Sequence, residues 1–171
     1  VSSYTHLIFE DVVLHDALII KEELMTIEHI YTIDFLDSFL NELTYHMMTS
    51  QLDEPTKNNL DAYIATLMSG GLSFTESFYQ IITESPSPLT QPLAHQISRY
   101  EHDTYFKMTI SFDLASSSPM IEDVISEISS SLNQRDIDFI IVGGVMSDLF
   151  VKDAIENEVL TLSYTPNELG I

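Results

Sequence analysis

The stretch Phe106-Lys-Met-Thr-Ile-Ser-Phe-Asp-Leu114 decides the fold, because apolar residues alternate in it with polar ones. This two-residue repeat is typical of a strand with one face buried. Ser118-Pro119 then starts a helix, whose apolar stripe runs to Leu132. Asp138–Val142 is a second apolar run and ends at Gly143-Gly144. A strand, helix, strand succession of this kind predicts two parallel strands.

The residues before this unit predict helices. Apolar residues recur at helical spacing from Leu14 to Met25 and again from Leu36 to Met47. A third helix is expected over Lys57–Ser69, and the capping box Ser73-x-x-Glu76 opens a fourth. The fold class expected is therefore α+β, with a helical N-terminal half followed by a small β-α-β-(α)-β unit whose strands are partly parallel.

Proline marks the predicted boundary between the two halves. Residues 85–92 hold three prolines and show no periodicity, which favours a linker. We expect an acidic, mostly helical region at 1–84 and an α/β region at 93–171, or one continuous domain in which both share a core. The last part of the chain predicts a short helix over Met146–Asp153 and a strand over Val159–Tyr164.

Charge is the most unusual feature of the composition. The chain has 27 Asp and Glu against 6 Lys and Arg, a net charge of -21. Charged residues make up only 19% of the chain, below the roughly 25% of ordinary soluble domains, so bases are missing as much as acids are added. Such a surface repels nucleic acid and anionic lipid and attracts cationic partners. We therefore expect a basic protein as partner, with no direct contact to nucleic acid or membrane.

The composition also excludes several classes of function. The chain has no cysteine, which rules out disulfides, thiolate metal sites and cysteine nucleophiles. No apolar run reaches the roughly 18 residues of a membrane span, so we expect a soluble, cytoplasmic protein. Neither a Walker loop nor a dinucleotide fingerprint occurs among the five glycines. No cofactor is expected.

Two histidines stand beside acidic residues at spacings that could suit metal binding. His15-Asp16 resembles the dyad of metal-dependent HD phosphohydrolases, and Glu42 and His46 are one helical turn apart. The HD family also needs a more distant upstream histidine, whereas His6 lies only nine residues before His15. The sequence therefore predicts scattered histidines and no metal site.

Residues Ile128–Phe150 resemble the opening of nucleotidyltransferase domains, in which a strand runs into a Gly-Gly turn and a helix. The matching residues are Ile137–Gly144 and Asp148–Phe150. That family holds magnesium with two acids on its next strand. Leu160–Tyr164 has no such pair, so the resemblance implies an inactive relative.

The same glycine pair is also similar to the last third of the dihydrofolate reductase fold. Phe150 and Glu158–Leu162 carry this second resemblance. A tight strand-to-helix turn is the alternative explanation for Gly143-Gly144.

The helix predicted after Thr32 carries an acidic-polar row. Asp34, Asp37, Asn41 and Tyr45 follow one another at steps of three and four residues. Side chains so spaced lie about 5 to 6 Å apart on one helix face. This spacing is comparable with that of charges along a nucleic acid.

The function expected is that of a non-enzymatic, acidic interaction protein that binds and blocks a basic partner, as an inhibitor, an immunity protein or a DNA mimic. Five residues are the candidate partner contacts: Glu22, Glu23, Asp34, Asp37 and Glu42. A second acidic region comprises Glu122, Asp123 and Glu127. Two alternatives stay open: an enzyme or inactive nucleotidyltransferase relative that uses the Gly143-Gly144 turn, and a structural or assembly domain of a larger protein. Three tyrosines expected at the surface leave room for a homodimer: Tyr4, Tyr31 and Tyr45.

Overall fold

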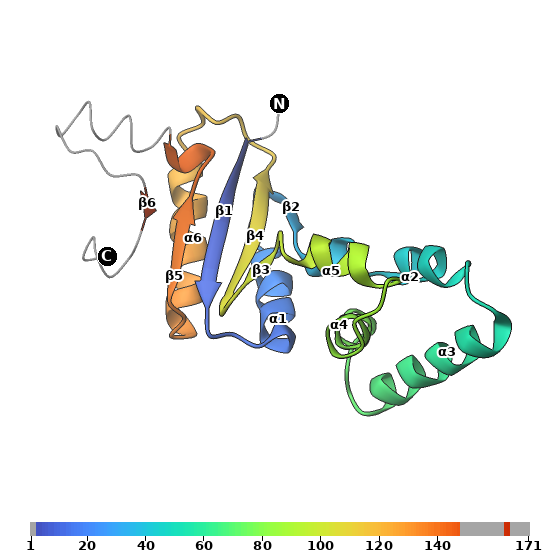
Figure 1. The fold of residues 1–171 in the computed structure, drawn as a ribbon. Coiled ribbons are helices and arrows are strands. Elements are labelled where there is room, and N and C mark those ends of the chain that lie inside the picture. The colour runs from blue at the N-terminus through green and yellow to red at the C-terminus, as the bar shows by residue number, and fades with distance from the viewer. Residues whose placement is uncertain (1–2, 148–162, 165–171) are drawn as a thin grey trace. The chain divides into compact units, whose positions relative to one another are not determined.

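The computed structural model describes residues 3–147 and 163–164. Its elements combine helices and strands, which confirms the α+β class (Figure 1). The chain divides into two compact units. The sheet unit comprises Val1–Asp34 and Glu101–Ile171, and the helical unit comprises Phe35–Tyr100.

The sheet unit is built on a sheet in the order β2-β4-β1-β5-β6, with β3 also paired to β4. Every pairing in it is antiparallel. Its elements are β1 (Ser3–Glu10), α1 (Leu14–Leu24), β2 (Ile30–Asp34), β3 (Glu101–His102), β4 (Tyr105–Phe112), α6 (Ile121–Gln134), β5 (Phe139–Val142) and β6 (Ser163–Tyr164).

The predicted parallel pairing of β4 with β5 is wrong, because β1 lies between them. Leu7 of β1 is opposite Met108 of β4 on one side and Ile141 of β5 on the other, both antiparallel. Because β4 and β5 are both antiparallel to β1, they run parallel to each other but are not paired. The N-terminal half is mostly helical, as expected, but it also contains β1 and β2, which the sequence analysis did not predict.

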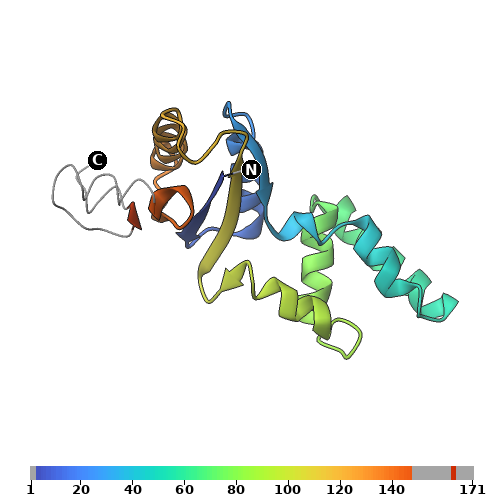
Figure 2. The same cartoon turned by 90° about the horizontal axis from the view of Figure 1, so that it is seen from above.

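The unit β1-α1-β2 repeats this split arrangement, with β4 inserted between its two strands. Two interleaved β-α-β units of this kind make the ferredoxin-like topology. Here the helical unit is inserted between β2 and β3. Figure 2 shows α6 on one side of the strand layer. The buried residues of α6 and of alternate strand positions form the core between them. Alternate strand residues fill that core, among them Leu7, Phe9, Met108 and Ile110.

The helices of the helical unit agree more closely with those predicted from the sequence. It contains a 3-10 turn η1 (Leu36–Ser38) and the helices α2 (Glu42–Thr49), α3 (Glu54–Ser69), α4 (Phe74–Glu84) and α5 (Gln91–Ile97). The third and fourth helices are confirmed, and Ser73 caps α4 by accepting from the Glu76 amide at 3.2 Å. Of residues 85–92, the first six connect α4 to α5 inside this unit, and Gln91 and Pro92 begin α5.

The helix expected from Leu36 to Met47 begins later than predicted. Phe35 has an extended backbone, with φ -149°, and only Leu36–Ser38 forms a short turn. Asn41 then caps α2, because its Oδ1 accepts from the Thr44 amide at 3.0 Å. An N-cap residue has non-helical backbone angles. Because Asn41 has such angles, α2 begins after it and does not include the preceding residues.

Tyr45 is buried, contrary to the expected exposure. Its ring meets Phe74 and Phe78 edge to face, with centroids 5.6 and 5.4 Å away. Its hydroxyl donates to Asp61 Oδ1 at 2.8 Å, and Lys57 Nζ donates to Asp61 Oδ2 at 2.8 Å. This clasp joins α2 to α3. The expected exposure of Tyr4 and Tyr31 is confirmed.

The described part of the chain has no helix long and apolar enough to cross a bilayer. The predicted helix over Met146–Asp153 and the predicted strand over Val159–Tyr164 lie largely outside the described residues, because the structure does not describe residues 148–162.

Candidate functional site

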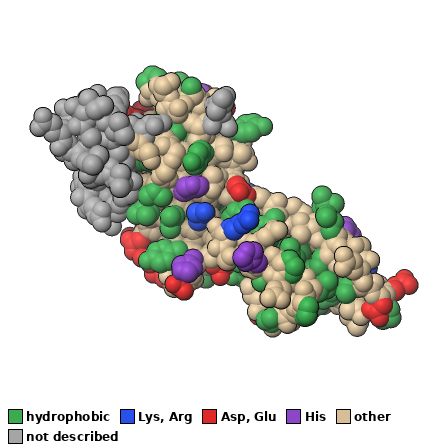
Figure 3. Space-filling view, turned by 45° about the horizontal axis from the view of Figure 1, so that its top comes forward, with side chains coloured by type: hydrophobic (Ala, Val, Ile, Leu, Met, Phe, Trp, Pro, Cys, Tyr) green, Lys and Arg blue, Asp and Glu red, His purple; other side chains and the backbone are tan. Residues whose placement is uncertain are grey.

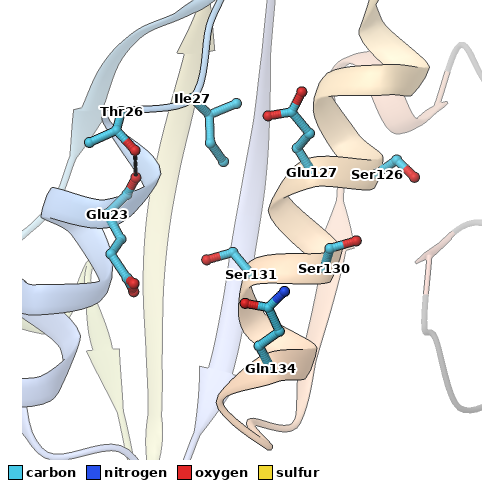
Figure 4. A pocket seen from close by; sticks show the side chains of 8 residues that line it. All are labelled: Glu23, Thr26, Ile27, Ser126, Glu127, Ser130, Ser131 and Gln134. Carbon is cyan, nitrogen blue, oxygen red and sulfur yellow. Dashed lines mark hydrogen bonds between the residues drawn. The ribbon is translucent and has the colours of Figure 1, made fainter.

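A polar groove lies between the end of α1 and the length of α6 (Figure 4). Its volume is about 370 Å³. Residues from both helix regions line it: Glu23, Thr26, Ile27, Ser126, Glu127, Ser130, Ser131 and Gln134. Two carboxylates, four hydroxyls and one amide thus surround a single apolar side chain.

The amphipathic pattern of α6 puts these polar residues at the groove. Its buried stripe includes Ile121, Ile128 and Leu132, which face the sheet. Glu127 and Ser131 are one turn apart and lie on the side of α6 that faces α1 (Figure 4). Because burial of the stripe fixes how α6 is rotated, the groove lining is a consequence of the core.

Glu23 already binds a guanidinium at this groove. Arg135 donates from Nε and from Nη2 to Glu23 Oε2, at 2.6 and 2.5 Å. Arg135 directly follows α6, so the pair links the two helices that form the groove. Their side chains are 34% and 48% exposed, and an ion pair this open contributes only about 0 to 1 kcal/mol to folding.

Glu127 differs from Glu23, because no cationic partner lies against it among the described residues. It is exposed and forms no hydrogen bond or ion pair with the residues that the structure describes. Carboxylates bind cationic donors through short, charge-assisted hydrogen bonds, and serine hydroxyls can complete the coordination. The groove therefore has the chemistry to bind an additional cationic group.

The five predicted contact residues lie on different elements. Glu22 and Glu23 are on α1 and Asp34 ends β2, all in the sheet unit. Asp37 lies in η1 and Glu42 in the first turn of α2, in the helical unit. Of these five, only Glu23 lines the groove.

The acidic row predicted for one helix is wrong. Asp34 belongs to a strand and Asp37 to a 3-10 turn, so the two do not share a helix face with Tyr45, which is buried. Ile33 and Phe35 are buried and Asp34 between them is exposed, which is the burial pattern of a strand end. Glu127 belongs to the second acidic region of the sequence, whereas no motif in the sequence singles out the groove serines. A polar stripe on an amphipathic helix carries no signal for what lies across from it.

The histidines considered as metal ligands lie apart. His15 and Asp16 are exposed on α1, whereas His6 points from β1 to the sheet face that α1 does not cover. Burial, and next the charge of Lys107, lower the pKa of His6. The described residues contain no group of three or more His, Asp or Glu side chains able to hold a metal ion.

Gly143 and Gly144 serve the packing of β5 against β1. Both have positive φ, 75° and 54°. A Cβ on Gly144 would collide with the Tyr4 carbonyl oxygen, and one on Gly143 would lie 3.1 Å from the His6 ring. The close approach of two strands accounts for the glycine pair without a nucleotide. Asp148–Phe150, on which the nucleotidyltransferase resemblance also depends, lie outside the described residues.

No protein-family model, curated protein or solved structure gives a significant match to this chain.

Proposed function

We propose that this chain is a non-enzymatic interaction protein that binds and blocks a basic partner through the acidic surface of its sheet unit. The observation that carries the proposal is the groove between α1 and α6. It brings together Glu23 and Glu127, which come from the two separate acidic segments of the sequence. A guanidinium, that of Arg135, already lies against one of them.

The distribution of charge between the units supports the same surface. The sheet unit has 20 carboxylate residues against 4 Lys and Arg, whereas the helical unit has 7 against 2. An excess of one sign raises the association rate of an oppositely charged partner. Glu122 and Asp123, in the first turn of α6, extend the acidic side chains beyond the groove. Glu22 and Asp34 add to the charge of the same unit, while Asp37 and Glu42 remain predicted contacts.

The groove favours arginine among the side chains of a partner. A guanidinium presents donors in a planar fork, which matches a carboxylate with hydroxyls beside it better than a single ammonium does. Surfaces rich in arginine are those with which proteins contact phosphates. The partner class is therefore a nucleic-acid-binding or toxin-like protein, and occupying its basic surface would block it.

Affinity capture from a lysate of the source cells tests this proposal. The chain should retain a basic protein at low salt and release it as salt rises, because screening weakens attraction between exposed charges. The purified partner should bind less nucleic acid, or lose its toxicity, when the chain is added in equal amount. Capture only of neutral or acidic proteins, or capture without inhibition, would refute the proposal.

A further inference from the structure

The sheet face opposite the helices has a composition unlike the rest of the unit. Strand residues alternate, so those next to the core residues point to this open face. Its central positions hold Tyr4, His6, Ile8, Lys107, Thr109, Ser111, Ile140 and Val142. Figure 3 shows hydrophobic, histidine and Lys or Arg side chains close together on the visible surface, and Lys107 is the cation among the central positions of this face.

No carboxylate stands among these central residues, although the unit contains 20. Glu10 lies at the end of β1, and Asp34 lies on β2 beyond β4. Lys107 is half-buried in the middle of the face and makes no hydrogen bond or ion pair with the described part of the chain. A partly buried lysine without a counterion, in a chain so rich in carboxylates, lacks the partner that such a charge needs.

The face is also ordered by its own contacts. Ile8 has Lys107 directly across on β4 and Ile140 across on β5. His6 Nδ1 is 3.0 Å from Thr109 Oγ1, and the rings of Tyr4 and His6 meet edge to face at 5.4 Å. The cross-strand pairs, together with the Tyr4–His6 contact along β1, hold side chains in place before any partner arrives. Little conformational freedom would be lost when another surface packs on them.

We propose that this open face is the interface of a homodimer, with a second copy of the chain as its occupant. Two sheets pack face to face at about 10 Å through interdigitating side chains, as this mixture of apolar and small polar residues permits. The high negative charge of the chain indicates which of its surfaces a second copy can approach. Two chains of net charge -21 repel each other through any carboxylate-rich surface, so contact is least unfavourable where carboxylates are missing.

The same face has charges of both signs that a second copy can match. Lys107 lies in the middle and Glu10 one diagonal step away, near the margin. A copy stacked with its own Glu10 aligned to Lys107 would supply the counterion that Lys107 lacks among the described residues. The acidic groove lies between the helices on the opposite side of the sheet, so dimer formation leaves it open. This inference is independent of the cationic partner proposed above.

The oligomeric state of the purified chain, measured by analytical ultracentrifugation over a range of protein and salt concentrations, tests the proposal. The parent should dimerise, and the dimer fraction should increase with salt, because screening reduces the repulsion between the copies. Binding of a cationic partner has the opposite salt dependence. A failure of one proposal is therefore distinguishable from a failure of the other. A parent that stays monomeric at every protein and salt concentration would overturn the homodimer.

Two variants and a control locate the interface. Ile8→Glu and Lys107→Glu each put a carboxylate on the face and should raise the dimer dissociation constant about tenfold or more. Asn133→Glu adds an acid at an exposed position of α6 and should change it little. Circular dichroism melting checks that Ile8→Glu is folded, and Lys107→Glu decides the matter if it is not. A dimer that both variants leave intact contradicts this interface.

Discussion

Glu23 of α1 and Glu127 of α6 line one groove. Of these two carboxylates, Glu23 binds the guanidinium of Arg135, and Glu127 has no cationic partner among the described residues. The side chain of Arg135 therefore occupies one of the two carboxylates of the groove. An external cation must either bind beside Glu127 or compete with Arg135 for Glu23.

Replacing Arg135 by Gln should strengthen binding of a cationic probe, such as an octa-arginine peptide, because Glu23 is released and a repelling charge is removed. Folding stability should fall by no more than about 1 kcal/mol, since the ion pair is exposed. Isothermal titration at low salt measures the affinity. Arg99→Gln, which removes an exposed charge in the helical unit, is the control for net charge. Equal affinities of the two variants would show that Arg135 does not guard the groove.

The Tyr45–Asp61–Lys57 clasp predicts a pH dependence of stability. The hydrogen bond from Lys57, and next that from Tyr45, lower the pKa of Asp61 below its usual 3.8. A carboxyl with a lowered folded pKa stabilises the fold above its unfolded pKa, and this stability is lost as pH falls through the folded value. Asp61→Asn should therefore melt below the parent at pH 7, and the difference should shrink below about pH 4. A difference that stays constant down to pH 3 would exclude this linkage.

Gly144→Ala tests the approach of β5 to β1. The new Cβ would meet the Tyr4 carbonyl oxygen and would also strain a residue with φ of 54°. The expected cost is about 3 kcal/mol or more in chemical denaturation. Gly71→Ala is a matched control, because Gly71 has φ of 107° but no atom within 4 Å of the added Cβ. Similar costs at both positions would mean that strain alone, rather than the strand contact, requires glycine.

Ile128→Asp tests the rotation of α6. Ile128 is fully buried in the apolar stripe, so the variant buries an unpaired charge and should lose about 3 kcal/mol or more. Asn133→Asp places the same charge at an exposed position of that helix and should stay within about 0.5 kcal/mol of the parent. Urea denaturation of the three proteins gives both differences. A parent-like Ile128→Asp would mean that the face of α6 is wrongly assigned.

Local sequence patterns predicted much of this fold. The alternation around Met108, the stripe through Ile128 and the cap at Ser73 each depend on neighbouring residues, and each element was found. Sheet order could not be predicted in the same way. It depends on β1, whose open-face residues Tyr4, His6 and Ile8 blur the alternation with its core residues.

The groove was beyond prediction for a related reason. Glu23 and Glu127 each stood out as part of an acidic segment, but their meeting depends on the packing of α1 and α6 over one sheet. The expected row of Asp34 and Asp37 was based on a helical period that the strand β2 interrupts. Charge composition thus led to the proposed kind of partner, whereas tertiary packing determined which carboxylates line one groove.

The affinity of the double variant Glu23→Gln, Glu127→Gln for the captured basic partner, measured as a function of salt, tests the central claim most directly. Gln keeps the size and hydrogen-bonding capacity of Glu and removes the charge, so affinity should fall by about 0.5 to 1 kcal/mol for each residue, and more if it becomes buried. The loss of affinity with salt should become less steep. Glu54→Gln with Glu84→Gln, exposed in the helical unit, should change both quantities less. A groove variant that binds as tightly as the parent, with the same salt dependence, would contradict the account.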